Sequence, residues 1–150
     1  MSMTQTDITR HLTGAWPKIE RELKSHPSSV LKRRPATYSD KTVFKALLLY
    51  VWRGLPVRET LGGKYPAGAV LHRRWRIWRD SGALRAMVGA FVKTLPRAQL
   101  KAWQGLLAQY DSQVRANSRK SKMAWLMVNR LWYDAVAVPF IEAGKRSGKK

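Results

Sequence analysis

Residues 65–82, YPAGAVLHRRWRIWRDSG, have the apolar spacing of one amphipathic helix. Leu71, Trp75, Trp78 and Gly82 stand at positions i, i+4, i+7 and i+11, which share one helical face at about 100° per residue. The opposite face and its flanks carry a mostly basic set of side chains: Ala69, His72, Arg73, Arg76, Arg79 and Asp80. The spacing therefore predicts a helix over about 67–80, with both indoles buried and the guanidinium groups facing outwards. Taken alone, the pattern also fits a surface helix with a solvated basic face.

Net charge is the most unusual bulk property of the chain. Its 150 residues contain 29 Lys and Arg against 9 Asp and Glu, which gives a formal net charge of +20. Repulsion on this scale opposes a compact fold, so a polyanionic partner is the natural explanation. Nucleic acid is the leading candidate, and an anionic membrane surface is the second.

The residue types present exclude several kinds of site. The chain has no cysteine, which excludes disulfides, thiolate metal sites and thiol nucleophiles. Its histidines lack metal-ligand spacing, and we expect no cofactor, metal or small-molecule substrate. The N-terminus has no apolar signal, and every apolar run is shorter than the ~20 residues that a membrane span needs. We therefore expect a soluble, cytoplasmic protein with no membrane partner.

Apolar periodicity predicts two helices before the 65–82 stretch. Residues 1–11 are polar and are expected to be a flexible N-terminus. Thr13 would cap a first helix over about 13–25, with Pro17 in its first turn. Ser39 or Asp40 would cap a core helix over about 40–53. The apolar stripe of that core helix consists of Val43, Phe44, Leu47, Leu48, Tyr50 and Val51.

The chain after residue 82 also has helical periodicity and no strand pattern. Ser81 and Gly82 would end the basic helix, and further helices are expected over about 83–95 and 96–110. Residues 111–122 read as a polar connector, followed by an apolar helix over about 122–138 that is interrupted near Pro139.

Glycine and proline positions predict a helix-turn-helix. Gly54 would end the 40–53 helix, and Pro56 would start a short helix over about 56–62. A turn over 62–66 then leads into the basic helix. In such motifs the second helix enters the major groove of DNA. The predicted fold class is thus all-α: a small helical bundle with a helix-turn-helix, followed by additional C-terminal helices.

Four motifs, in the same order, resemble the N-terminal DNA-binding domain of IS-five-like DDE insertion-sequence transposases. They are Leu12-Thr13 with Trp16 and Ile19-Glu20, the basic KRRPATYSD at 32–40, VFKALLLYVWRGLPVRET at 43–60, and LHRRWRIWRDSG at 71–82. The resemblance implies a DNA-binding domain over 12–95, in a bacterial protein that associates with the nucleoid. Residues 96–143 would then be a helical extension that packs on this domain or forms a homodimer, and 144–150 a disordered basic tail.

Candidate DNA contacts follow from the charge of each element. Base-edge contacts are expected from the exposed face of the basic helix: Ala69, His72, Arg73 and Arg76. Phosphate contacts are expected from basic residues around it: Lys32, Arg33, Arg34, Lys41, Lys45, Arg58 and Arg79. The double-stranded DNA partner would be attracted by the whole basic surface and read by the arginines.

Carboxylates are too few for the chemistry of the family's catalytic domain. The stretch at Asp111 faintly resembles the surroundings of the first catalytic aspartate, which makes Asp111 a candidate relic. Only Asp134 and Glu142 follow it, and the remaining chain is too short for the strands that hold such a triad. We therefore expect a non-enzymatic, sequence-preferring DNA-binding protein: a truncated transposase, a first-frame product or a transcriptional regulator. The alternatives are a general nucleic-acid binder and an enzyme fragment that needs a second chain.

Overall fold

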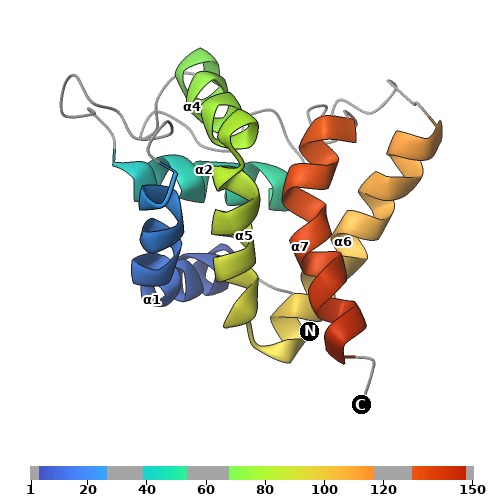
Figure 1. The fold of residues 1–150 in the computed structure, drawn as a ribbon. Coiled ribbons are helices and arrows are strands. Elements are labelled where there is room, and N and C mark those ends of the chain that lie inside the picture. The colour runs from blue at the N-terminus through green and yellow to red at the C-terminus, as the bar shows by residue number, and fades with distance from the viewer. Residues whose placement is uncertain (1–3, 27–38, 54–67, 117–129, 148–150) are drawn as a thin grey trace.

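The computed structural model of the protein describes residues 4–26, 39–53, 68–116 and 130–147. Six helices and no strand occupy these ranges, which confirms the predicted all-α fold class. The helices are α1 (Gln5–Lys24), α2 (Asp40–Arg53), α4 (Gly68–Ser81), α5 (Ala83–Lys93), α6 (Arg97–Ala116) and α7 (Arg130–Ser147) (Figure 1).

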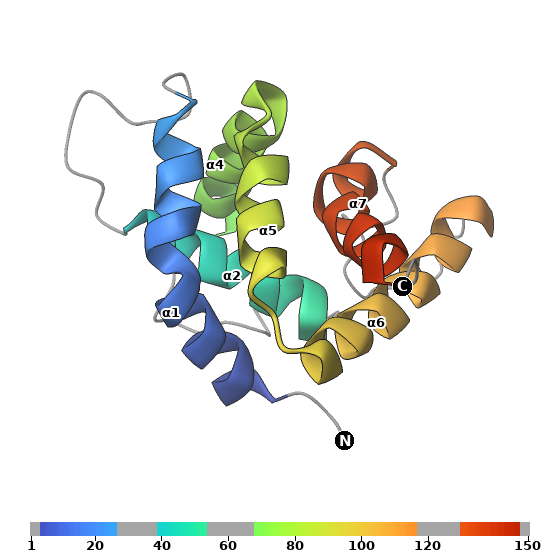
Figure 2. The ribbon, with the colours of Figure 1, turned by 60° about the horizontal axis from the view of Figure 1, so that its bottom comes forward.

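Helix α5 lies at the centre of the bundle, with α1 on one side and α7 on the other (Figure 1 and Figure 2). Helix α2 contacts α1 and α4, and α6 packs along α7. The corner from α4 into α5 requires glycine, because Gly82 has a φ of 87° in the left-handed region. The predicted end of the basic helix at Ser81-Gly82 is therefore confirmed.

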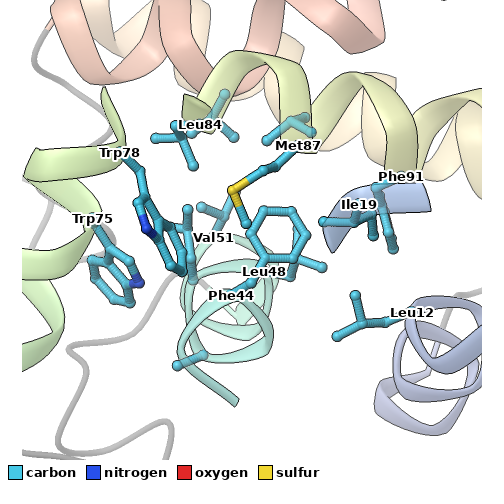
Figure 3. Close-up of a cluster of buried hydrophobic side chains, with 14 of the residues drawn as sticks. Leu12, Ile19, Phe44, Leu48, Val51, Trp75, Trp78, Leu84, Met87 and Phe91 are labelled. Atoms are coloured by element: carbon cyan, nitrogen blue, oxygen red, sulfur yellow. The ribbon is translucent and has the colours of Figure 1, made fainter. Parts of the chain in front are cut away.

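A single hydrophobic core joins all six helices (Figure 3). The ring of Phe44 on α2 lies 6.4 Å from that of Trp78 and 6.5 Å from that of Phe91 on α5. The ring of Phe91 in turn lies 6.4 Å from that of Phe140 on α7. The C-terminal helices thus pack on the same core as the predicted DNA-binding domain, within one chain. The predicted homodimer stays a prediction.

Helix α1 starts earlier than the sequence pattern predicts. The backbone N–H of Asp7 donates to Thr4 Oγ1 at 3.1 Å, and the N–H of Thr4 donates to Asp7 Oδ2 at 2.9 Å. This reciprocal capping box begins the helix at Gln5. The prediction of a flexible segment over 1–11 is therefore wrong for residues 4–11, and Thr13 is not a cap. Pro17 lies inside the helix at an exposed position, not in its first turn.

The C-terminal helices are longer than predicted. Helix α6 continues through Ala116, so residues 111–116 are helical and not part of a connector. Helix α7 continues through Pro139 to Ser147, so the predicted interruption there and the predicted disorder of 144–147 are wrong. Gln104 Nε2 donates to the carbonyl of Phe140 at 3.0 Å, which fixes α7 against α6 just after the proline. The start of the predicted 122–138 helix lies outside the described residues.

Helix α2 follows its prediction closely. The backbone N–H of Thr42 donates to Ser39 Oγ at 3.2 Å, which identifies Ser39 as the cap. All six residues of the predicted stripe are fully buried. The predicted short helix over 56–62 and the turn over 62–66 lie outside the described residues, so the helix-turn-helix remains a prediction.

Candidate nucleic-acid interface

Helix α4 is held on the bundle by one apolar face. Leu71, Trp75 and Trp78 are at most 1% exposed, which confirms that both indoles are core supports. Trp75 Nε1 donates to the carbonyl of Val43 on α2 at 2.9 Å. Figure 3 shows the two indoles pointing from α4 towards Phe44, Leu48 and Val51. These contacts fix the rotation of α4 about its axis, and therefore fix which residues face outwards.

The outward face of α4 carries two exposed arginines. Arg73 and Arg76 are exposed, one helical turn apart. Neither forms an ion pair or a hydrogen bond within the described ranges of the chain. Because no described residue neutralises their charges and the helix beneath them is fixed, they are candidates for contact with an external anion. This agrees with the face predicted from the spacing.

Arg79, a predicted phosphate contact, is paired with its neighbour on the same helix. Its Nε and Nη2 atoms donate to Asp80 Oδ1 at 3.0 and 2.9 Å. The Arg79 side chain is 20% exposed and that of Asp80 is 62% exposed. A phosphate at this end of α4 would have to compete with this carboxylate, so Arg79 is a weaker candidate than Arg73 or Arg76.

Arg74, the remaining arginine of α4, has a structural role that its position in the sequence did not predict. Arg74 is 8% exposed and its Nη2 pairs with Asp40 Oδ1 in the first turn of α2. Its guanidinium carbon also lies 5.7 Å from the ring centroid of Trp78. Burial lowers the pKa of Arg74, and the charge of Asp40 and its hydrogen bond counteract that shift. Arg74 is therefore a structural link between α4 and α2, not a contact for DNA.

We predict that the two partners of this ion pair contribute unequally to stability. Asp40→Ala leaves the buried guanidinium of Arg74 without its carboxylate and should cost about 2–4 kcal/mol in unfolding free energy. Arg74→Met keeps the apolar volume and leaves a carboxylate that is 38% exposed and can be hydrated, so it should cost about 1 kcal/mol. Urea unfolding of both variants measures the difference. Equal costs would contradict the assignment of Arg74 as the desolvated partner.

His72 is only partly available at the predicted interface. Its ring is half-buried and lies 5.1 Å from the ring of Trp75 and 6.4 Å from that of Tyr50. Burial lowers the pKa of His72, so the ring is neutral at neutral pH. As a DNA contact it would therefore act through a hydrogen bond and not through a positive charge.

The remaining predicted contacts divide into two groups. Lys41 and Lys45 are partly exposed, lie one turn apart on α2, and form no ion pair among the described residues. Both lie in the half of α2 that bonds to α4 through Asp40 and Val43. The other predicted contacts lie where the structure describes no side chain: Lys32, Arg33, Arg34, Arg58 and Ala69. Of these, Ala69 is placed in the first turn of α4 by its backbone.

The carboxylates considered as catalytic relics are spread over the C-terminal helices. Asp111 lies in α6, and its side chain is outside the described part. Glu142 Oε1 on α7 is 3.3 Å from Arg85 Nη2 on α5, an exposed ion pair between two helices. Asp134 is exposed on α7. In the ranges that the structure covers, no three histidine or carboxylate side chains form a group that could hold a metal ion.

Comparisons with protein-family models, with curated proteins and with solved structures each find no match for this chain. None of the helices in the described ranges combines the length and the apolar character needed to cross a bilayer. The structure itself defines a helical bundle in which one exposed helix face carries arginines.

Proposed function

We propose that this protein binds double-stranded DNA through the outward face of α4. The observation that carries this proposal is the pair of exposed arginines, Arg73 and Arg76, which form no ion pair with any described residue. They stand on a helix whose opposite face is fixed by two buried tryptophans. The major groove of B-DNA accepts an α-helix, and arginine recognises guanine O6 and N7 with two parallel hydrogen bonds. A fixed helix removes the cost of ordering the backbone on binding, so that only the arginine side chains lose freedom.

Phosphate contacts would orient the helix in the groove. Lys41 and Lys45 on α2 are the described candidates, and Lys32, Arg33, Arg34 and Arg58 are candidates from the sequence alone. The formal net charge of +20 adds long-range attraction to any polyanion. We assign affinity mainly to these charges and sequence preference to Arg73 and Arg76.

The resemblance of residues 12–95 to a transposase DNA-binding domain supports a sequence-preferring protein that belongs to or derives from a transposase. On this proposal the protein acts in transposition or as a transcriptional regulator, at the nucleoid of a bacterial cell. It needs no cofactor, and we propose no catalytic role for Asp111.

A general nucleic-acid binder is the second candidate. Two of the predicted DNA contacts on α4 favour it. His72 is half-buried and neutral, and Arg79 is paired with Asp80. This leaves few groups on α4 for reading base edges. A protein that contacted only the sugar-phosphate backbone of a nucleic acid would need only exposed cations.

Salt dependence tests the predicted phosphate contacts, and competition by other nucleic acids tests the proposal against this second candidate. If about seven phosphates are neutralised, as predicted, the logarithm of the affinity should fall with the logarithm of salt concentration at a slope of roughly −6. Measured by fluorescence anisotropy at 150 mM salt, single-stranded DNA and A-form RNA should compete at least about tenfold less well than duplex DNA. Equal competition by RNA would favour the general binder.

A further inference from the structure

Asp80 places a carboxylate on the outward face of α4, among the arginines proposed to contact DNA. It stands seven residues after Arg73 and four after Arg76, so the three side chains lie within about 60° of one another around the helix axis. The Asp80 side chain is 62% exposed. The two buried tryptophans that fix the rotation of α4 therefore also fix Asp80 on the face of the two arginines.

The stability of α4 does not explain a carboxylate at this position. Helix α4 ends at Ser81, so Asp80 lies in its last turn, where a negative charge opposes the helix dipole. The ion pair of Asp80 with Arg79 joins adjacent residues of one helix, and an exposed pair contributes little to stability. At this helix end it is Ser81 Oγ, and not Asp80, that bonds to the carbonyl of Trp78. The only acidic residue of α4 is therefore better explained by what this face of the helix contacts.

Arg79 orients the Asp80 carboxylate and leaves one of its oxygen atoms open. The Nε and Nη2 atoms of Arg79 both donate to Oδ1 of Asp80, at 3.0 and 2.9 Å. No group in the described part of the chain donates a hydrogen bond to Oδ2. A carboxylate oxygen accepts hydrogen bonds and donates none, so a partner that binds Oδ2 must supply an N–H or O–H group.

Duplex DNA, the partner proposed for this face, offers such donors on its bases and not on its phosphates. Phosphate oxygens are negatively charged acceptors, which a carboxylate repels. The donors in the major groove are the amino groups of cytosine N4 and adenine N6. A carboxylate next to adenine N6 also faces the acceptor N7, whereas cytosine N4 has no neighbouring acceptor on its own base. Cytosine N4 is therefore the donor that suits Asp80 best.

We infer that Asp80 determines specificity by accepting a hydrogen bond from cytosine N4 in the major groove, beside the guanines contacted by Arg73 and Arg76. The same charge repels phosphate and so lowers the affinity for duplexes that lack this cytosine. With a rise of about 1.5 Å per residue, Asp80 lies about 6 Å along the axis from Arg76, or about two base-pair steps of DNA. The recognised sequence would thus contain a cytosine within about three base pairs of a guanine. This inference rests on the proposed function and deepens it by naming the bases.

Asp80→Asn is the most direct test, because it keeps the size of the side chain and removes its charge. Glu20→Gln is the matched control, since the Glu20 carboxylate also pairs with a cation of its own helix, Lys24 at 3.7 Å, and the change in net charge is the same. Selection from random duplexes measures the preference at each base position. Fluorescence anisotropy measures the affinity for a duplex of unrelated sequence, and urea unfolding checks that both variants are folded.

We expect Asp80→Asn to lower the preference for cytosine at one motif position at least about fivefold. Adenine should become acceptable there, because asparagine bonds to adenine N6 and N7. The affinity for the unrelated duplex should rise about two- to fivefold, since a charge that repels phosphate is lost. Glu20→Gln should leave the motif unchanged and alter this affinity less than about twofold. The urea midpoint of Asp80→Asn should not fall, because the charge that opposes the helix dipole is removed.

The inference is overturned if the wild-type motif contains no cytosine within about three base pairs of its guanine. It is also overturned if Asp80→Asn enriches the wild-type motif with its cytosine preference intact, because Asp80 would then only repel phosphate. An equal gain in affinity from Glu20→Gln would contradict the repulsion, since the gain would follow net charge alone. Failure of the proposed function is a different result, in which the wild type enriches no motif at all.

Discussion

Replacing Arg73 and Arg76 together by alanine is expected to weaken duplex binding by roughly 30-fold to 10⁴-fold. Each arginine that contacts a base edge contributes about 1–3 kcal/mol, and about 1.4 kcal/mol corresponds to a tenfold change in affinity. Both side chains are exposed and form no ion pair with another described residue, so unfolding free energy should stay within about 0.5 kcal/mol of the wild type. Fluorescence anisotropy with a labelled duplex at fixed salt measures the loss.

Arg21→Ala with Lys24→Ala is the matched control for this experiment. These two cations are exposed on α1 and have the same spacing of three residues, so the control removes the same charge from the protein surface. Lys24 lies 3.7 Å from Glu20 in an exposed ion pair, which contributes little to stability. We expect it to weaken binding only about two- to threefold, through the general loss of positive charge. Equal losses in the two double variants would show that binding follows net charge and not the α4 face.

Trp75→Ala should lower the unfolding free energy by about 3–5 kcal/mol. The side chain is fully buried, its indole N–H bonds to the Val43 carbonyl, and its ring stacks on Tyr50 at a centroid distance of 6.0 Å. The total unfolding free energy of a natural domain is about 5–15 kcal/mol, so this loss removes a large part of the stability. Trp75→Phe should lose less, because most of the apolar volume is kept. Chemical unfolding followed by circular dichroism measures both.

Trp16→Ala is the comparison for the buried tryptophan. Trp16 is half-buried at the edge of the core, 6.4 Å from the ring of Phe44, so its removal should cost less than that of Trp75. If Trp75→Ala instead kept full stability and lost DNA binding, Trp75 would be a base-stacking residue and the orientation of α4 described above would be wrong.

Local spacing predicted those parts of the fold in which one helix face meets the core. The stripe of α2 and the Leu71–Trp75–Trp78 face of α4 are buried as their periodicity requires, and Gly82 ends α4 because only glycine adopts its backbone angle readily. The start of α1 was missed because Thr4 to Arg10 are mostly polar. Ile8 and Leu12 are buried only because α1 packs along α5, which is a tertiary contact that local composition does not show.

The candidate site could be predicted only where local helical spacing determines which residues are exposed. Arg73 and Arg76 were identified as exposed by their place opposite the tryptophans. Arg74 was not identified, because its partner Asp40 is 34 residues away in the sequence. The sequence does contain one indication that Arg74 is buried. It stands three residues after Leu71 and four before Trp78, at the flank of the buried face. The sequence pattern around Asp40 predicts a helix cap, whereas its ion pair with Arg74 follows from the packing of α4 on α2.

Selection of bound duplexes from a pool of random sequences tests the central claim most directly. The wild-type protein is expected to enrich a short motif that contains guanine, and Arg73→Ala or Arg76→Ala should each relax the preference at a different position of that motif. This outcome would show that the exposed arginines of α4 read base edges. If the wild type enriches no motif at any salt concentration, or if both variants enrich the wild-type motif unchanged, α4 is not the surface that reads DNA.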